Sequence, residues 1–427
     1  MIKADDGQQL NIGYACLALG VIGTAMKTCR LEGATPERLE TLTAGNLNAL
    51  ETLIRYNAHN SIRLFRISSD LVPFGSHPSK PFAWQYAFAS RLSEISKLIK
   101  ASSMRVSMHP GQYTVLNSTN PVVIQRAIDD LVYHERVLSG LKTDSASKIV
   151  LHIGGVFSNK KEALQRFCTH FIYLDDAVKR RLVIENDDRC FHIGDVLETA
   201  VKLKIPVVFD TLHHQINGCG AKAPYEWIDL CRATWRSQDG TQKIHYAQQD
   251  ETKRPGAHSK TIRVSAFLDF AQQLKNERID IMLEVKDKNL SAVKCALCLD
   301  QNGCIKTLEK QWRLYKYLVL EKNPSGYSAI RELLKDKSAY PAAAFFEIID
   351  TSREMAENTG FAVNAAQQVW GCFKTLCTPA EKAAFEKLLN GYRSGQNSFS
   401  RVKSYLFKLS VKYNTTYLTD SYFYIGE

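Results

Sequence analysis

Residues 181–210, RLVIENDDRCFHIGDVLETAVKLKIPVVFD, contain one strand–helix–strand unit. The runs RLVIEN (181–186) and PVVFD (206–210) are short and rich in branched apolar residues, as buried strands are. Between them, residues 194–204 place valine, leucine and alanine at helical spacing. Two strands joined by a helix in this way are expected to lie parallel in one sheet.

Six further runs of the same kind lie on either side of this unit. They are NIGYAC (11–16), IRLFRIS (62–68), MRVSMH (104–109), KIVLHI (148–153), KIHYAQ (243–248) and IDIMLEV (279–285). Helix-like stretches separate most of them, at 84–101, 121–140, 159–170, 225–235 and 261–276. Eight strands that alternate with helices can close into a barrel without an exposed edge. We therefore predict the α/β class, as a (β/α)₈ TIM barrel with an added C-terminal all-helical domain.

An open, doubly wound sheet is the alternative arrangement for this pattern. Such a sheet often carries a glycine-rich phosphate-binding turn after its first strand. The chain reads Tyr14-Ala15-Cys16-Leu17 at this point, which is no dinucleotide fingerprint. The closed barrel is therefore favoured.

Beyond residue 305 the pattern changes to helices alone, separated by breaks that contain glycine, proline or serine. We predict a barrel domain over residues 1–304 and a helical domain of unknown role over residues 305–427. The helical stretches begin LEKQWRLYKY (308–317), YSAIRELLKD (327–336), AAAFFEIID (342–350), NAAQQVWG (364–371), PAEKAAFEKL (379–388) and SRVKSYLFKL (400–409).

The composition is that of a globular protein, with 45% hydrophobic and 23% charged residues in 427. The chain shows neither a secretory signal nor an apolar run that could span a bilayer, so a cytoplasmic protein without membrane contact is expected. Its eleven cysteines are scattered and are expected to be reduced. The tightest group, Cys295, Cys298 and Cys304, lacks a nearby fourth ligand and is expected to pack on a helix.

Six histidine and carboxylate side chains fall at or near the ends of six consecutive predicted strands. They are His109, His152, Glu185, Asp210, His245 and Glu284. The loops add His213, His214 and His258. Active sites of such barrels form at the carboxyl ends of the strands, so these side chains should converge on one mouth. A single histidine at a strand end is more often structural, but so many polar groups around one axis would be poorly compensated without cations.

Imidazole and carboxylate ligands suit zinc, manganese or iron, and this set exceeds the three or four ligands of one ion. We therefore predict a cluster of two or three divalent ions, which would suit phosphoester hydrolysis. The net charge of +11 favours a polyanionic partner and agrees with this chemistry.

The remaining histidines are expected to lie outside the cluster. His59, His134, His170 and His192 fall in helices or turns and are interpreted as structural or surface residues. His77 follows the second strand, where contact with the cluster or a phosphate is left open.

Seven segments, in order over residues 10–300, carry a family resemblance. They are FRISSDLVPFGSH (65–77), RVSMHPGQYTVLNS (105–118), VLHIGG (150–155), VIEND (183–187), VVFDTLHH (207–214), KIHYAQQ (243–249) and IMLEVKDKNLSAVKC (281–295). This set resembles the ultraviolet damage endonuclease family. The resemblance implies a repair nuclease that nicks DNA immediately 5′ to pyrimidine dimers, 6-4 photoproducts and some other lesions.

The resemblance also implies a ligand set and a metal. The expected ion is Mn²⁺, with Zn²⁺ or Mg²⁺ as alternatives, and the expected partner is damaged double-stranded DNA. We expect a monomer, associated with the nucleoid when it acts. The implied ligands are His109, His152, Glu185, Asp210, His213, His245, His258, Glu284 and Lys243, of which Lys243, Glu185 and His245 are expected to be catalytic.

Lys243 matches a family lysine that is carboxylated and bridges the metals. Carboxylation turns the lysine amine into a carbamate. The carbamate supplies an anionic oxygen ligand that a plain ammonium cannot. The alternative interpretation of Lys243 is a lysine at the barrel mouth that holds a phosphate.

DNA contacts are implied at three places. Gln112 and Tyr113 match the residues that the family inserts into the DNA helix at the lesion, where a distorted step is easier to open. The alternative is a tight turn with an exposed tyrosine. Backbone contacts are expected from Tyr14, Arg66, Ser68 and Ser69.

The sequence departs from the family shortly after its first strand and leaves other functions open. Ala18 stands where a Tyr-x-Cys-x-Asn pattern would place asparagine, which puts the range of lesions in doubt. Alternatives are an apurinic-site endonuclease of the endonuclease IV type, a sugar isomerase on the same barrel, and a damaged-DNA-binding protein without catalysis. The complete ligand set argues against the last of these.

Overall fold

The computed structural model describes residues 9–80, 82–274 and 278–425. Its contacts divide the chain into two compact units. The first comprises Met1–Ala18, Ile22–Ile262 and Asp269–Ala296, and the second comprises Leu19–Val21, Arg263–Leu268 and Leu297–Glu427. The boundary at residues 304 and 305 stays a prediction.

Eight parallel strands form a closed barrel in the order β1-β2-β3-β4-β5-β6-β7-β8, as predicted. Every predicted strand overlaps one of them. Their bounds are β1 Gln9–Ala15, β2 Leu64–Ile67, β3 Arg105–Met108, β4 Ile149–His152, β5 Leu182–Glu185, β6 Val207–Asp210, β7 Lys243–Tyr246 and β8 Arg278–Leu283. The TIM-barrel fold class is confirmed.

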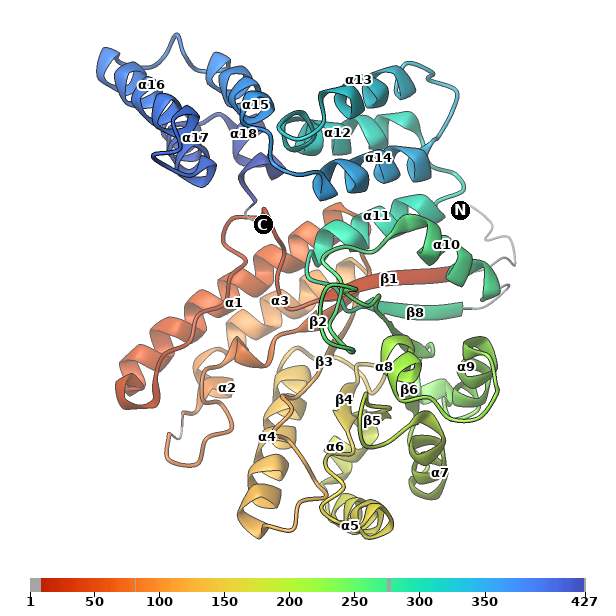
Figure 1. Ribbon diagram of the computed structural model, residues 1–427. Coiled ribbons are helices and arrows are strands. Elements are labelled where there is room, and N and C mark those ends of the chain that lie inside the picture. Colours follow the sequence, from red (N-terminus) through yellow and green to blue (C-terminus); the bar gives the residue numbers. More distant parts are fainter. Residues whose placement is uncertain (1–8, 81, 275–277, 426–427) are drawn as a thin grey trace. The chain divides into compact units, whose positions relative to one another are not determined.

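Helices follow each strand, and α1, α3, α4, α5, α7 and α9 surround the strands in Figure 1. Their bounds are α1 Pro36–His59, α2 Trp84–Ala87, α3 Ala89–Ala101, α4 Pro121–Gly140, α5 Lys160–Ile172, α6 Asp176–Arg181, α7 Ile193–Leu203, α8 Thr211–Ile216, α9 Pro224–Arg232, α10 Val264–Gln273 and α11 Asn289–Leu299. Short 3-10 turns lie at Leu31–Gly33, Ser69–Leu71 and Ser237–Asp239.

Two differences from the predicted helices concern this unit. The 24-residue helix α1 was not predicted, although Thr35 caps it by accepting from the Arg38 N–H and Pro36 begins it. The predicted helix 84–101 is broken at Phe88, whose backbone leaves the helical region at φ −114° and ψ 19°. Residues 275 and 276 of the predicted helix 261–276 lie outside the described residues.

The second unit is built from helices. They are α12 Ile305–Leu320, α13 Pro324–Leu333, α14 Ala342–Glu354, α15 Thr359–Gly371, α16 Pro379–Arg393, α17 Phe399–Lys412 and α18 Thr416–Thr419, with a 3-10 turn at Tyr422–Tyr424. Its core contains Val369, Phe373, Val402 and Leu406, all without exposed surface. Among the described residues, no helix combines the length and apolar character that crossing a bilayer requires.

On β4, β5 and β6 the inside of the barrel changes from apolar to polar along the strand. Val150, Val183 and Val208, from β4, β5 and β6, form one buried cluster. Because side chains alternate along a strand, the residue two positions further on in each case is His152, Glu185 or Asp210 and faces the same side. The apolar cluster therefore supports a polar layer at the carboxyl ends of the strands.

Candidate metal centre

The six strand-end residues singled out in the sequence lie on neighbouring strands. His152, Glu185 and Asp210 are the last residues of β4, β5 and β6. His109 and Glu284 directly follow β3 and β8, and His245 is the third residue of β7. His152 is in register with Glu185, and Asp210 with His245, so each pair is aimed in one direction.

Glu185 lies at the centre of four imidazoles. Its Oε1 is 2.7 Å from His245 Nδ1, and its Oε2 is 3.1 Å from His109 Nε2. His152 Nε2 and His213 Nδ1 each lie 3.7 Å from one of the same two oxygens. The carboxylate is 1% exposed, so these contacts replace its hydration.

Glu284 extends the group on the side of β8. Its Oε1 pairs with Arg66 and lies 3.4 Å from His245 Nδ1, and its Oε2 lies 3.7 Å from His258 Nε2. The loop that brings His258 here is held by a bridge between His258 and Gln249. Arg66 therefore lies among the predicted ligands and neutralises one of their carboxylates.

Asn186 connects the ends of β5 and β6. Its side chain accepts from the Asp210 N–H at 2.9 Å and donates to the Asp210 carbonyl at 3.1 Å. Its own carbonyl lies 2.9 Å from His213 Nδ1. If Nδ1 carries the proton, the lone pair of His213 Nε2 is left for a ligand role.

Two groups of these residues have the geometry of metal ligands. His109, His152 and Glu185 form one, and Glu185, Asp210 and His245 form the other, each with ligand atoms within 4.8 Å of one another. Glu185 is common to both. Asp210 Oδ2 and His245 Nε2 are buried and have no hydrogen-bond partner among the described residues. Buried groups of this kind normally have a partner, so these residues fit a group that holds cations.

The titration of the site reflects burial and the crowding of its charges. Burial lowers the pKa of His152 to about 4, and burial raises the pKa of Asp210 to about 6. Burial alone would lower the pKa of His213, but the carboxylates of Asp210, Glu185 and Glu284 together raise it to about 9. Burial alone would raise the pKa of Glu185, but His245 and His152 hold it well below its ordinary value.

Lys243 is wholly buried two positions before His245 on β7. Its Nζ has no hydrogen-bond partner among the described residues. Burial lowers its pKa well below the ordinary value, and the nearby Arg105 adds to that effect, while Asp280 opposes it. Arg105 itself is paired with Asp280 at 2.7 Å. Lys243 is therefore placed where an uncharged amine is favoured.

The predicted DNA contacts differ in their accessibility. Gln112 and Tyr113 are exposed in the loop after β3, and Tyr113 is 83% exposed. Ser68 caps the following 3-10 turn, and Ser69 donates to the His109 carbonyl at 3.1 Å.

Tyr14 requires a correction. It has no exposed surface, and its hydroxyl donates to Oδ1 of Asn57 on α1 at 2.7 Å. A direct contact of Tyr14 with DNA is therefore not supported by this structure.

The other histidines have partners of their own. His134 is buried against Ser69 and Asp130, His170 contacts the Leu116 carbonyl, and His192 caps α7. His77 contacts Ser79, and the His214 ring packs against Phe209 and Trp227. His59 ends α1.

Two residues of the site were assigned no such role in the sequence. Asn186 was within the VIEND segment but was not singled out, and Arg66 was assigned to DNA rather than to Glu284. Arg66 lies on β2, and Glu284 directly follows β8. These strands are far apart in the sequence, and only β1 separates them in the closed barrel. A local pattern does not contain that pairing.

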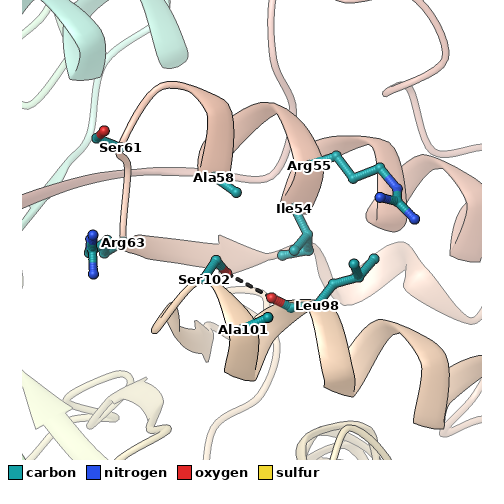
Figure 2. Close-up of a pocket in the computed structure, with 8 residues that line it drawn as sticks. All are labelled: Ile54, Arg55, Ala58, Ser61, Arg63, Leu98, Ala101 and Ser102. Atoms are coloured by element: carbon teal, nitrogen blue, oxygen red, sulfur yellow. Dashed lines mark hydrogen bonds between the residues drawn. The ribbon is translucent and has the colours of Figure 1, made fainter.

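A cavity of about 470 Å³ lies elsewhere in the first unit. Figure 2 shows its lining, from the last turns of α1 and α3 and from Arg63 just before β2. Ser102 donates to the Leu98 carbonyl within it. Because β2 begins at Leu64, this cavity lies at the amino ends of the strands, away from the candidate metal centre.

Comparisons with known proteins identify relatives of this chain. A family model described as UV-endonuclease UvdE matches residues 10–311, and a model for a protein of unknown function (DUF1722) matches residues 316–425. A UV DNA damage endonuclease of Clostridium perfringens is 35% identical over 407 residues, which cover 94% of this chain and 96% of the relative. A UV-damage endonuclease of Schizosaccharomyces pombe is 35% identical over 295 residues, 65% of this chain but 48% of the relative. The crystal structure of SacUVDE aligns with a TM-score of 0.65 and 35% identity, over 71% of this chain and 99% of that one.

Proposed function

Because this chain belongs to the UV-endonuclease UvdE family, we propose that it is a DNA repair endonuclease. It recognises ultraviolet photoproducts in double-stranded DNA and cuts the strand immediately 5′ to them by metal-assisted phosphodiester hydrolysis. The observation that carries this proposal is Glu185, which is common to two candidate ligand groups at the mouth of the barrel.

Two or three divalent ions would be held by the residues that surround Glu185. The proposed ligands are His109, His152, Glu185, Asp210, His213, His245, His258, Glu284 and Lys243, and Mn²⁺ is the proposed ion. When bound, such ions lower the pKa of water and stabilise the negative charge on a phosphate and its leaving oxygen. Asp210 Oδ2 and His245 Nε2, which have no hydrogen-bond partner among the described residues, support this assignment.

The protein's own residues would orient these ligands. The Asn186 side chain holds the Asp210 backbone through two hydrogen bonds, and the Asn186 carbonyl would fix the tautomer of His213. Arg66 balances the charge of Glu284. Fixing the ligands in advance lowers the cost of reorganisation during the reaction.

Lys243 is proposed to act as a carbamate. Its amine favours the uncharged form, which is the form that attacks carbon dioxide. The new nitrogen–carbon bond gives a carbamate anion and releases one proton. The cationic neighbourhood of Arg105, Arg66 and Lys148 that disfavours an ammonium would favour this anion. Incubation with isotopically labelled bicarbonate, followed by carbon NMR, should show one signal that Lys243→Ala lacks.

Gln112 and Tyr113 are proposed to enter the DNA helix at the lesion. Both side chains are exposed on the loop that follows His109, so they can contact DNA while the proposed metal ligands stay at the ends of the strands. Ser68, Ser69 and Arg66 are proposed to contact the DNA backbone. In this structure Ser69 is bonded to the His109 carbonyl and Arg66 is paired with Glu284.

Nicking of supercoiled plasmid tests the function. Irradiated plasmid should be nicked in the presence of Mn²⁺, whereas unirradiated plasmid should stay intact and chelator should stop the reaction. A plasmid with abasic sites serves as the comparison substrate. If abasic sites were cut while irradiated plasmid stayed intact, the proposed lesion would be wrong.

A further inference from the structure

The loop after β4 contains an exposed aromatic ring that the proposed function does not use. Phe157 is 40% exposed, three residues before α5 begins at Lys160. It lies outside the segments that carry the family resemblance. Because β4 is parallel to β3, this loop leaves the barrel at the same mouth as the loop of Gln112 and Tyr113.

The backbone at this position has a conformation that bulky residues avoid. Phe157 has φ 49° and the next residue, Ser158, has φ 73°. Left-handed conformations are common for glycine and asparagine but are outliers for phenylalanine. Strain of this kind persists where the surroundings impose it, and it is concentrated at functional sites.

Packing holds the ring in one place. The Arg166 guanidinium from α5 lies over the Phe157 ring, 5.7 Å from its centroid. The ring also packs against Gly155, where an added Cβ would lie 3.2 Å from the ring edge. An exposed aromatic ring that is fixed in this way loses little conformational entropy when it binds a ligand.

Hydrogen bonds connect this loop to the loop of Tyr113. Buried Asn117 donates to the Gly155 carbonyl at 2.7 Å, and Arg166 Nε donates to the Asn117 carbonyl at 2.9 Å. Gly154 has φ 114°, and a Cβ there would lie 2.3 Å from Asn117 Oδ1. The loops that follow β3 and β4 are therefore packed tightly against each other beside the candidate metal centre.

We propose that the Phe157 ring stacks on a nucleobase of the DNA substrate, next to the base step that Gln112 and Tyr113 enter. Arg166 is the positioning residue that holds the ring. This inference rests on the proposed function, because it takes damaged DNA as the ligand. Every nucleobase offers a flat face, so this contact would add affinity without reading the sequence.

Three variants separate stacking from packing. Phe157→Asn removes the ring and suits the left-handed backbone, Phe157→Gly relieves the backbone further, and Phe157→Tyr keeps a ring. Tyr173→Ala is the matched control, because Tyr173 is 79% exposed at the other end of α5. Affinity for a duplex with one photoproduct is measured by fluorescence anisotropy in chelator, beside the melting temperature of each protein.

Phe157→Asn and Phe157→Gly should bind the duplex about 5-fold to 150-fold more weakly, the range found for removal of one stacked aromatic residue. Their melting temperatures should equal or exceed that of the wild type, because strain is relieved. Phe157→Tyr and Tyr173→Ala should bind as the wild type does.

Two results would overturn the inference. One is unchanged binding by Phe157→Asn, and the other is weaker binding together with a clearly lower melting temperature, which would assign the ring to packing of the loop. If the wild type itself failed to prefer the damaged duplex, the proposed function would be the part that is wrong.

Discussion

Glu185 and His245 meet inside the barrel with 2.7 Å between Oε1 and Nδ1, and neither side chain is open to solvent. They come from β5 and β7, and Asp210 of the intervening strand β6 is in register with His245. This pair therefore spans three strand ends, and a change in either residue should affect the whole cluster.

Glu185→Gln should abolish nicking of irradiated plasmid while binding of the DNA survives. An amide has the shape of the carboxylate but not its charge, so both candidate ligand groups lose their shared anion. Substitution of a residue that only supports a metal ligand lowers metal affinity or activity about 10- to 100-fold. Glu185 is itself a proposed ligand, so we expect a larger loss. The measurements are plasmid nicking and elemental analysis of the purified protein; His245→Ala should behave similarly.

Glu198→Gln is the control for this change. Glu198 lies on the outside of α7, with 68% of its side chain exposed, and pairs with Lys202. It should keep wild-type nicking and metal content. Near-normal nicking by Glu185→Gln would contradict the cluster assignment.

Tyr113→Ala should reduce the preference for damaged DNA without affecting stability. The side chain is 83% exposed, and changes at such surface positions alter the free energy of unfolding by less than about 0.5 kcal/mol. Equilibrium binding to matched duplexes with and without a photoproduct gives the ratio to compare. If both affinities fell by the same factor, Tyr113 would bind DNA but would not recognise the lesion.

The sequence predicted the barrel because its strands carry their own signal. Short runs such as RLVIEN and PVVFD are buried on both faces, and the positions of His152, Glu185 and Asp210 at the carboxyl ends of such runs predict that they lie together. The family resemblance, built on segments that include these residues, is confirmed by the match over residues 10–311.

What the sequence missed depends on contacts between distant segments. The burial of Tyr14 follows from its hydrogen bond with Asn57 on α1, a helix that was not recognised. The ion pair of Arg66 and Glu284 joins residues 218 positions apart. Such pairs depend on the closure of the barrel, which is not visible in a run of neighbouring residues.

Arg66→Ala should destabilise the metal-free protein. Arg66 and Glu284 are 14% and 11% exposed, and removal of one partner from a buried pair costs about 3–5 kcal/mol in the free energy of unfolding. Urea unfolding in chelator measures this cost. The double variant Arg66→Met with Glu284→Gln should lose less, because no charge is left without a partner. A loss below about 1 kcal/mol in the single variant, the level of exposed ion pairs, would contradict the pairing.

Asn186→Ala should weaken both the fold and the metal site. The buried N–H of Asp210 would lose its acceptor, which costs about 1–3 kcal/mol in the free energy of unfolding. Asp210 would also lose its orientation, so metal content should fall. Urea unfolding of the wild type and of Asn186→Ala measures this cost. An unchanged free energy of unfolding would show that the hydrogen bond to Asp210 is unimportant.

His213 should make the stability of the metal-free protein depend on pH. The surrounding carboxylates raise its pKa in the folded chain to about 9, against about 6.5 for an unfolded chain. A histidine with a raised pKa stabilises the fold in its protonated form, so its contribution is full below about pH 6.5 and disappears as the pH rises through about 9. In chelator, the difference in melting temperature between the wild type and His213→Gln should therefore shrink over this range. Metal binding should show the opposite trend, because it requires the neutral imidazole and competes with the proton. A difference in melting temperature that stayed constant from neutral to alkaline pH would show that Asp210, Glu185 and Glu284 do not hold a proton on His213.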